Sequence, residues 1–160
     1  MLPHIEIDLS RQRLRLALAQ VTLREYPVST ARNGAGEREG SECTPRGRHF
    51  IAARIGAGMP PGTVFVARKP TGEVWSPTFA ASQAPERDWI LTRILWLAGA
   101  EPGRNQGGDC DTYARYIYLH GTPDSVALGQ PGSRGCVRMR NADIIELFTA
   151  VAVGCPVFIR

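Results

Sequence analysis

A histidine and a cysteine stand at either end of a glycine-rich segment in the last third of this 160-residue chain. The segment runs from His120 to Asn141 and reads HGTPDSVALGQPGSRGCVRMRN. Cysteine catalysis needs a nucleophilic sulfur, a base that takes the thiol proton, and N–H groups that stabilise an oxyanion. His120 can be the base, and Gly135 leaves space and backbone N–H groups beside Cys136. The segment therefore predicts nucleophilic thiol chemistry.

The electrostatic surroundings expected for Cys136 favour its thiolate. The imidazole of His120, the start of a predicted helix and the guanidinium of Arg138 should each lower the pKa of the thiol. The spacing alone also fits a second interpretation. A cysteine ahead of a helix is commonly a buried apolar residue, and a histidine after a strand is commonly structural.

The elements that must position these residues are mostly strands. Period-two alternation and short apolar runs predict a mainly β chain in which Pro27 marks an edge strand. The strands are expected at residues 4–9, 13–18, 22–28, 48–55, 63–68, 89–97, 113–119 and 155–159. The run at 89–97 also fits a short helix, but its β-branched and aromatic residues favour a strand. Glycine-rich loops are expected at 33–47, 101–108 and 121–135. One helix, capped by Asn141 or Asp143, should end at Gly154.

Composition excludes several classes of protein. A length of 160 residues predicts one domain over residues 1–160, and the shares of hydrophobic residues (43%) and charged residues (21%) are near those of globular proteins. The net charge of +4 comes from arginines spread along the chain, with Lys69 the single lysine, so a nucleic-acid partner is not expected. No apolar run is long enough to span a bilayer. The cysteine and histidine spacings match no metal motif, and no cofactor is expected.

The N-terminus lacks a basic region followed by an apolar stretch. We therefore expect a cytoplasmic protein, or a periplasmic one if the natural chain is longer. The oligomeric state is left open.

The segment around Cys136 resembles the L,D-transpeptidase catalytic domain, or YkuD, family. That family has a histidine, a loop, then Ser/Thr-His-Gly-Cys, a hydrophobic residue, Arg and a helix led by Asn or Asp. Here His120-Gly121-Thr122 is followed by Ser133-Arg134-Gly135-Cys136-Val137-Arg138-Met139. Upstream, IEIDLSRQRLRL, YPVSTA and TPRGRHF are similar to family landmarks, and VGCPVFI is similar to its last strand. Two positions depart from the family pattern: Arg134 replaces a common His, and Cys155 a common Thr.

The resemblance implies a fold and a set of roles. The fold would be a YkuD-like β-sandwich or mixed sheet, with one C-terminal helix after the cysteine loop. Cys136 would be the nucleophile and His120 the general base, oriented by the carbonyl of Ser133 or Arg134. The N–H groups of Gly135 and Cys136 would form the oxyanion hole. Arg138, Gly121 and Thr122 would contact the substrate. Arg138 could instead brace the loop, and Gly121 and Thr122 would shape the turn after His120.

The resemblance also implies a peptidoglycan substrate. Family members attack the bond between the meso-diaminopimelate (or lysine) residue of a tetrapeptide stem and its terminal D-Ala, and they form a thioester. Transfer of the acyl group to water gives L,D-carboxypeptidation, expected here as part of cytoplasmic peptidoglycan recycling. Transfer to the amine of a second stem gives a 3-3 cross-link. A third alternative is an inactive module that binds the peptide stem.

Overall fold

The computed structural model describes residues 2–160, whose ten strands form one mixed sheet. The strands are β1 His4–Asp8, β2 Arg13–Leu18, β3 Val21–Pro27, β4 Gly47–Ile55, β5 Thr63–Val66, β6 Lys69–Val74, β7 Ile90–Gly99, β8 Tyr118–Gly121, β9 Val137–Met139 and β10 Pro156–Ile159. Their order is β3-β2-β1-β10-β4-β7-β5-β6, and β8 connects β7 to β9. The predicted mainly β fold with a mixed sheet is confirmed.

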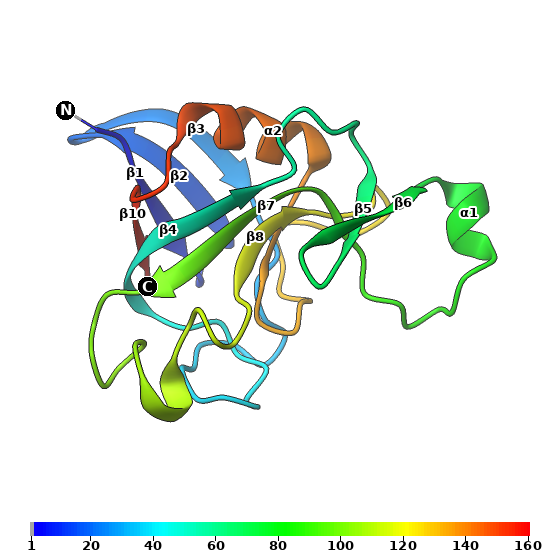
Figure 1. The fold of residues 1–160 in the computed structure, drawn as a ribbon. Helices are drawn as coiled ribbons and strands as arrows, with labels where there is room; N and C mark the ends of the chain where they lie inside the picture. Colours follow the sequence, from blue (N-terminus) through cyan, green and yellow to red (C-terminus); the bar gives the residue numbers. More distant parts are fainter. Residues whose placement is uncertain (1) are drawn as a thin grey trace.

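Strand β7 is the hub of the sheet, because it pairs with β4, β5 and β8. It is buried over nearly its whole length, as a continuous apolar run predicts. Figure 1 shows β1–β3 at one end of the molecule and the β5–β6 hairpin with α1 at the other. Among the ten strands of residues 2–160, only β1–β10 and β8–β9 pair in parallel. The second parallel pair is the one that carries the predicted catalytic residues.

Two α-helices, α1 Pro77–Ala81 and α2 Asn141–Ala150, accompany the sheet. A short 3₁₀ turn spans Gly108–Cys110. Helix α2 lies across the sheet and adds Ile144, Leu147 and Phe148 to the main core, together with apolar residues of β1, β2, β4, β7 and β10. Within residues 2–160, neither helix is long and apolar enough to cross a membrane.

Several sequence-based boundaries were wrong. The strand expected at 113–119 begins only at Tyr118, because residues 113–116 form turns and Tyr116 has a left-handed φ of +58°. The strand expected at 63–68 ends at Val66, where a tight turn leads into β6, which was not predicted. Helix α1, which begins after the cap Ser76, was also missed. Helix α2 ends at Ala150, four residues before the expected Gly154.

The expected cap of α2 was wrong as well. The N-cap residue is Arg140, without a side-chain cap hydrogen bond. The side chain of Asn141 instead donates to the Thr122 carbonyl at 3.1 Å and accepts from the Thr92 hydroxyl at 2.5 Å. Asn141 thus connects the helix to β7 and to the turn after His120. The terminal position of β3 in the sheet agrees with the edge strand predicted from Pro27.

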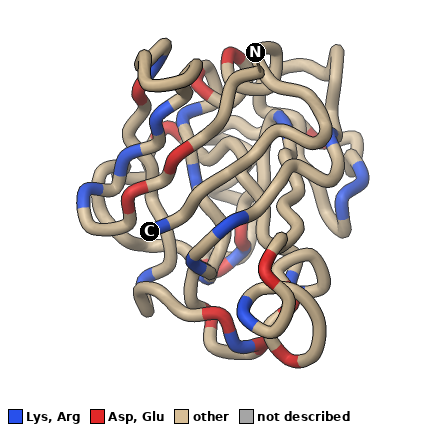
Figure 2. The backbone as a smooth tube through the Cα atoms, turned by 90° about the vertical axis from the view of Figure 1, so that its left-hand side faces the viewer, with Lys and Arg blue, Asp and Glu red and all other residues tan. Residues whose placement is uncertain are grey.

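Charged residues are spread along the chain. Figure 2 shows basic and acidic residues interleaved along the chain, without one continuous basic face in that view. This distribution agrees with the expectation from the sequence that the positive charge is dispersed.

Candidate active site

Cys136 and His120 line one cavity of about 270 Å³. The other lining residues come from the β5–β6 hairpin, the start of β7, strand β8 and the segment leading into β9. They are Ala67, Arg68, Asp88, Ile90, Tyr116, Tyr118, Ser133, Arg134 and Arg138. Strands β8 and β9 bring the two predicted catalytic residues together, since their parallel register sets Leu119 beside Val137 and His120 beside Arg138. Cys136 therefore precedes β9 next to the strand that carries His120.

The sulfur of Cys136 is held by two backbone groups. The N–H of Tyr118 donates to Sγ at 3.3 Å, and the thiol donates to the carbonyl of Tyr116, also at 3.3 Å. Neither tyrosine was predicted to have a role at this site. A thiol that donates to a carbonyl is protonated, so this geometry describes a neutral resting cysteine.

The pKa of the Cys136 thiol is raised by burial to about 12, which corrects the expected thiolate. The N–H of Tyr118 and the guanidinium of Arg138 lower this pKa, but burial outweighs them. The predicted contribution of the helix N-terminus fails for a structural reason. Strand β9 separates Cys136 from α2, and helix-terminus effects fade within about one turn.

His120 is fully buried, and burial lowers the pKa of its imidazole. Its Nδ1 lies 2.6 Å from the carbonyl oxygen of Gly121. A carbonyl can only accept a hydrogen bond, so Nδ1 carries the proton and Nε2 keeps its lone pair. The orienting carbonyl thus belongs to Gly121, whereas the sequence predicted Ser133 or Arg134. The resting pair is a neutral imidazole and a neutral thiol, suited to general-base activation of the sulfur.

Ser133 fastens the loop that carries the nucleophile. Its hydroxyl donates to the carbonyl of Cys136 at 2.5 Å and accepts from the N–H of Gly135 at 3.1 Å. The Gly135 N–H is therefore already engaged. No acceptor is found for the Cys136 N–H within residues 2–160, so this amide is the free member of the predicted oxyanion pair. Gly135 has a φ of +133°, and a Cβ there would lie 3.1 Å from Cδ1 of Ile117.

Arg138 braces the site. Its guanidinium donates to the carbonyl of Gly132 at 3.1 Å and forms an ion pair with Asp88 at 3.3 Å. Of the two roles left open by the sequence, these contacts favour bracing. Arg134 is exposed and lies on the same cavity wall.

Gly121 and Thr122 are buried and do not line the Cys136 cavity. The N–H of Thr122 donates to the carbonyl of Met139 at 3.1 Å. A Cβ on Gly121 would lie 2.7 Å from the carbonyl of Leu91 and even closer to Asn141 Oδ1. Both residues therefore shape the turn after His120.

A second, strongly charged cavity of about 290 Å³ adjoins the first. The two share Asp88, Ser133, Arg134 and Arg138. The remaining walls of the second cavity come from loops on the other side of Ser133. They are Arg32, Asn33, Glu42, Pro85, Glu86, Arg87 and Gly132. Residues 2–160 contain no group of three or more His, Cys, Asp or Glu side chains placed to share a metal ion.

Sequence reasoning missed Tyr116, Tyr118, Asp88 and Arg68 as site residues. The YARYIYL run carried a signal, because its aromatic side chains directly precede His120. The sequence contained no comparable signal for Asp88 or Arg68, which reach the cavity from distant segments.

Comparison with known proteins identifies the family to which the sequence is similar. Residues 3–159 match the L,D-transpeptidase catalytic domain, YkuD. Among curated proteins, the chain is 36% identical over 99 residues to "Probable L,D-transpeptidase YbiS" of Escherichia coli strain K12, covering 59% of this chain and 30% of that one. It is 38% identical over 62 residues to "Putative L,D-transpeptidase YkuD" of Bacillus subtilis strain 168, covering 36% and 38%. The chain thus spans about 30% of the length of the first curated relatives it matches.

Solved structures show the same fold. An L,D-transpeptidase from Mycobacterium smegmatis superposes with a TM-score of 0.57 at 18% identity, covering 99% of this chain and 58% of the other. L,D-transpeptidase 3 from Mycobacterium tuberculosis gives a TM-score of 0.59 at 16% identity, covering 99% and 61%. The family match over nearly the whole chain, together with this fold, shows that the chain belongs to the L,D-transpeptidase catalytic domain family.

Proposed function

We propose that this chain cleaves the L,D peptide bond before the terminal D-Ala of a peptidoglycan tetrapeptide stem through a thioester on Cys136. The observation that carries the proposal is the neutral Cys136–His120 pair on one cavity wall, with Nδ1 of His120 engaged by Gly121. His120 is thereby left with Nε2 as the only basic nitrogen of its ring.

Acylation follows from this arrangement. As Sγ attacks the carbonyl carbon of the scissile bond, the S–H bond breaks and the thiol proton, hydrogen-bonded at rest to the Tyr116 carbonyl, moves from Sγ to Nε2 of His120. The Cys136 N–H is available to the oxyanion of the tetrahedral intermediate. His120 then gives its proton to the leaving nitrogen, the C–N bond breaks, and D-Ala departs. Deacylation repeats these steps with the acceptor in place of the thiol.

Hydrolysis is the proposed fate of the acyl-enzyme, which makes the chain an L,D-carboxypeptidase. The loop at 33–47 packs closely beside the nucleophile: the Thr44 hydroxyl donates to the Gly135 carbonyl at 2.8 Å, and Arg115 donates to the Cys43 carbonyl at 2.8 Å. A loop fixed in this way limits the space for a second peptide stem and leaves a polar cavity that water can fill. Part of the same proposal is a role in cytoplasmic peptidoglycan recycling.

Transpeptidation is the second candidate. The charged cavity beyond Ser133 includes Glu42, Glu86 and Asp88, and carboxylates attract the amine that a cross-linking acceptor must present. The names of the curated relatives point the same way.

The products from a purified disaccharide tetrapeptide distinguish these outcomes. We expect mainly tripeptide and free D-Ala by mass spectrometry, with no product from Cys136→Ala and full activity from Cys110→Ala, a thiol outside both cavities. Predominantly 3-3 cross-linked dimers would establish the transpeptidase instead. Peptide binding without any D-Ala release would indicate the inactive binding module. Recovery of the native protein in the periplasm would contradict the cytoplasmic role.

A further inference from the structure

Arg68 occupies a strained turn at the edge of the Cys136 cavity. It and Ala67 form the two-residue connection between β5 and β6, with φ values of +66° and +49°. Turns with two left-handed residues match the twist of a β-hairpin but are unfavourable for residues other than glycine, asparagine or aspartate. Strain of this kind concentrates at functional sites. Both residues line the cavity that contains the nucleophile.

Aromatic side chains fix the guanidinium of Arg68. Its Cζ lies 4.6 Å from the ring centre of Tyr116 and 5.0 Å from that of Trp96, and its Nη1 donates to the Tyr118 hydroxyl at 3.0 Å. Trp96 is held in turn by a parallel stack on Tyr113, with ring centres 4.0 Å apart. The guanidinium therefore lies against a rigid aromatic surface, which reduces the entropy lost when it binds a ligand.

The same two tyrosines position the nucleophile. The Tyr116 carbonyl and the Tyr118 N–H hold Sγ of Cys136, while the Tyr116 ring and the Tyr118 hydroxyl hold Arg68. The placement of the cation relative to the sulfur is thus set by two residues that contact both. An arginine that served only to stabilise the hairpin would not need this connection.

Arg68 has no acidic partner within 4 Å among residues 2–160. The cavity wall carries three arginines, Arg68, Arg134 and Arg138, against one carboxylate, Asp88, which is paired with Arg138. A guanidinium has five N–H donors, and the protein uses only one of them here. The cavity therefore carries excess positive charge and a preorganised donor group.

We propose that Arg68 binds a carboxylate of the acyl-donor peptide beside Cys136. The proposal rests on the function proposed above and adds a specificity-determining residue to it. Planar guanidinium groups bind carboxylates through two parallel hydrogen bonds. Two sources fit this chemistry: the C-terminal carboxylate of the leaving D-Ala, and the side-chain carboxylate of the diamino acid whose carbonyl is attacked.

Binding of L-Ala-γ-D-Glu-meso-diaminopimelyl-D-Ala tests the proposal without turnover when measured by calorimetry in a Cys136→Ala background. Three peptides are compared: the free acid, the C-terminal amide and the diaminopimelyl side-chain amide. Arg68→Gln should weaken binding of the free acid about tenfold to a hundredfold, the loss typical of a charge-assisted pair. Lys69→Gln, the same charge change one residue along on an exposed side chain, should have less than a twofold effect.

The amidated peptides identify the carboxylate. The amide that removes the bound group should bind the Cys136→Ala protein as weakly as Arg68→Gln binds the free acid, and Arg68→Gln should not weaken it further. Equal weakening of all three peptides by Arg68→Gln, or no weakening of any, would overturn the carboxylate site. If Arg68→Gln is without effect while wild-type enzyme releases D-Ala, only this inference fails. If no peptide binds and no D-Ala is released, the proposed function fails as well.

Discussion

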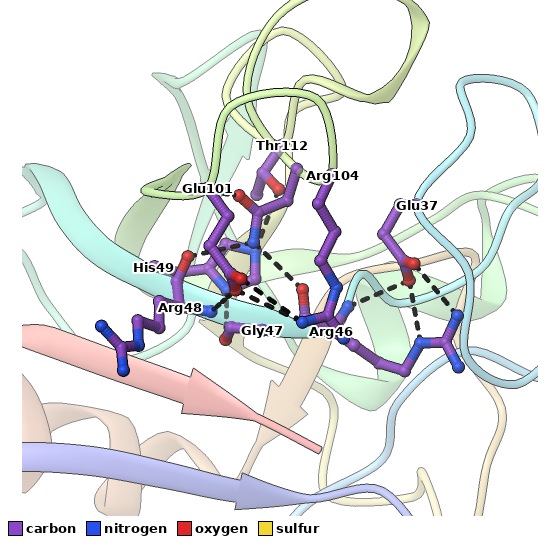
Figure 3. Close-up of polar contacts among 9 residues, drawn as sticks. Glu37, Arg46, Gly47, Arg48, His49, Glu101, Arg104 and Thr112 are labelled. Carbon is purple, nitrogen blue, oxygen red and sulfur yellow. Dashed lines mark hydrogen bonds and ion pairs between the residues drawn. The ribbon is translucent and has the colours of Figure 1, made fainter.

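His49 should make the folded protein sensitive to acid. It is 2% exposed, on β4, with Nε2 2.9 Å from the Thr112 hydroxyl and Nδ1 3.1 Å from the Gly47 carbonyl. Figure 3 shows this imidazole under the loop that carries Glu101 and Thr112. That loop leads directly to the turn that holds the sulfur of Cys136. Protonation of His49 therefore bears on both stability and the site.

The magnitude follows from the pKa of His49, which burial lowers from 6.5 to about 4. Glu101 and Glu37 favour the protonated form and Arg104 disfavours it, but burial dominates. Between these two pKa values the unfolded chain binds more protons than the folded one, so stability rises with pH across that range. Acidification from pH 7.5 to pH 5 should lower the unfolding free energy by about 2 kcal/mol.

Urea denaturation at a series of pH values measures this effect. His49→Gln removes the titrating group, so its unfolding free energy should not show this acid-dependent loss. As the pH falls from 7.5 to 5, the stability advantage of the wild type over His49→Gln should shrink by about 2 kcal/mol. Thr112→Val is the control, because it removes one hydrogen bond and leaves the imidazole in place. It should keep the acid-dependent loss. Parallel curves for wild type and His49→Gln would refute the reasoning.

Three further predictions concern the site. Because burial lowers the pKa of His120, kcat/KM should fall with acid only below pH 6.5 and stay level to pH 9; an acid limb above 6.5 would contradict a neutral resting base. Gly135→Ala should lower the unfolding free energy by about 1–3 kcal/mol and remove most activity, because alanine is strained at φ +133° and its Cβ would lie close to Ile117. Unchanged urea denaturation would argue against this backbone strain. Ser133→Ala frees the Gly135 N–H and the Cys136 carbonyl, so kcat should fall more than KM rises, and a pure KM effect would argue against loop positioning.

Much of the fold could be predicted because its signals are local. Alternation identified β1 and β2, and the β-branched and aromatic residues of the mostly apolar run at 89–97 favoured a strand for β7. The prediction of a strand from Tyr113 was wrong because the aromatic residues there lie in a turn. Tyr113 stacks on Trp96, and the Tyr116 carbonyl accepts a hydrogen bond from the Cys136 thiol. Those contacts join residues that are distant in the sequence, so they leave no periodic pattern in it.

The site, like the fold, could be predicted only where the signal is local in the sequence. The positions of His120 and Cys136 were available from the motif, and the parallel register of β8 and β9 sets them on one cavity. Their protonation states were not available, because burial, which raises the pKa of the thiol and lowers that of the imidazole, depends on what packs around them. The orienting carbonyl of Gly121 depends on the turn that the half-buried Asn141 side chain fixes.

The central claim is that Cys136 carries the acyl group. Rapid acid quenching of the enzyme with excess tetrapeptide, followed by peptide mass mapping, tests it most directly. We predict a tripeptidyl adduct, of the mass of the donor less D-Ala, on the fragment containing Cys136, formed as D-Ala is released. D-Ala release that persists in Cys136→Ala, or an adduct on Cys43, Cys110 or Cys155 alone, would contradict the account.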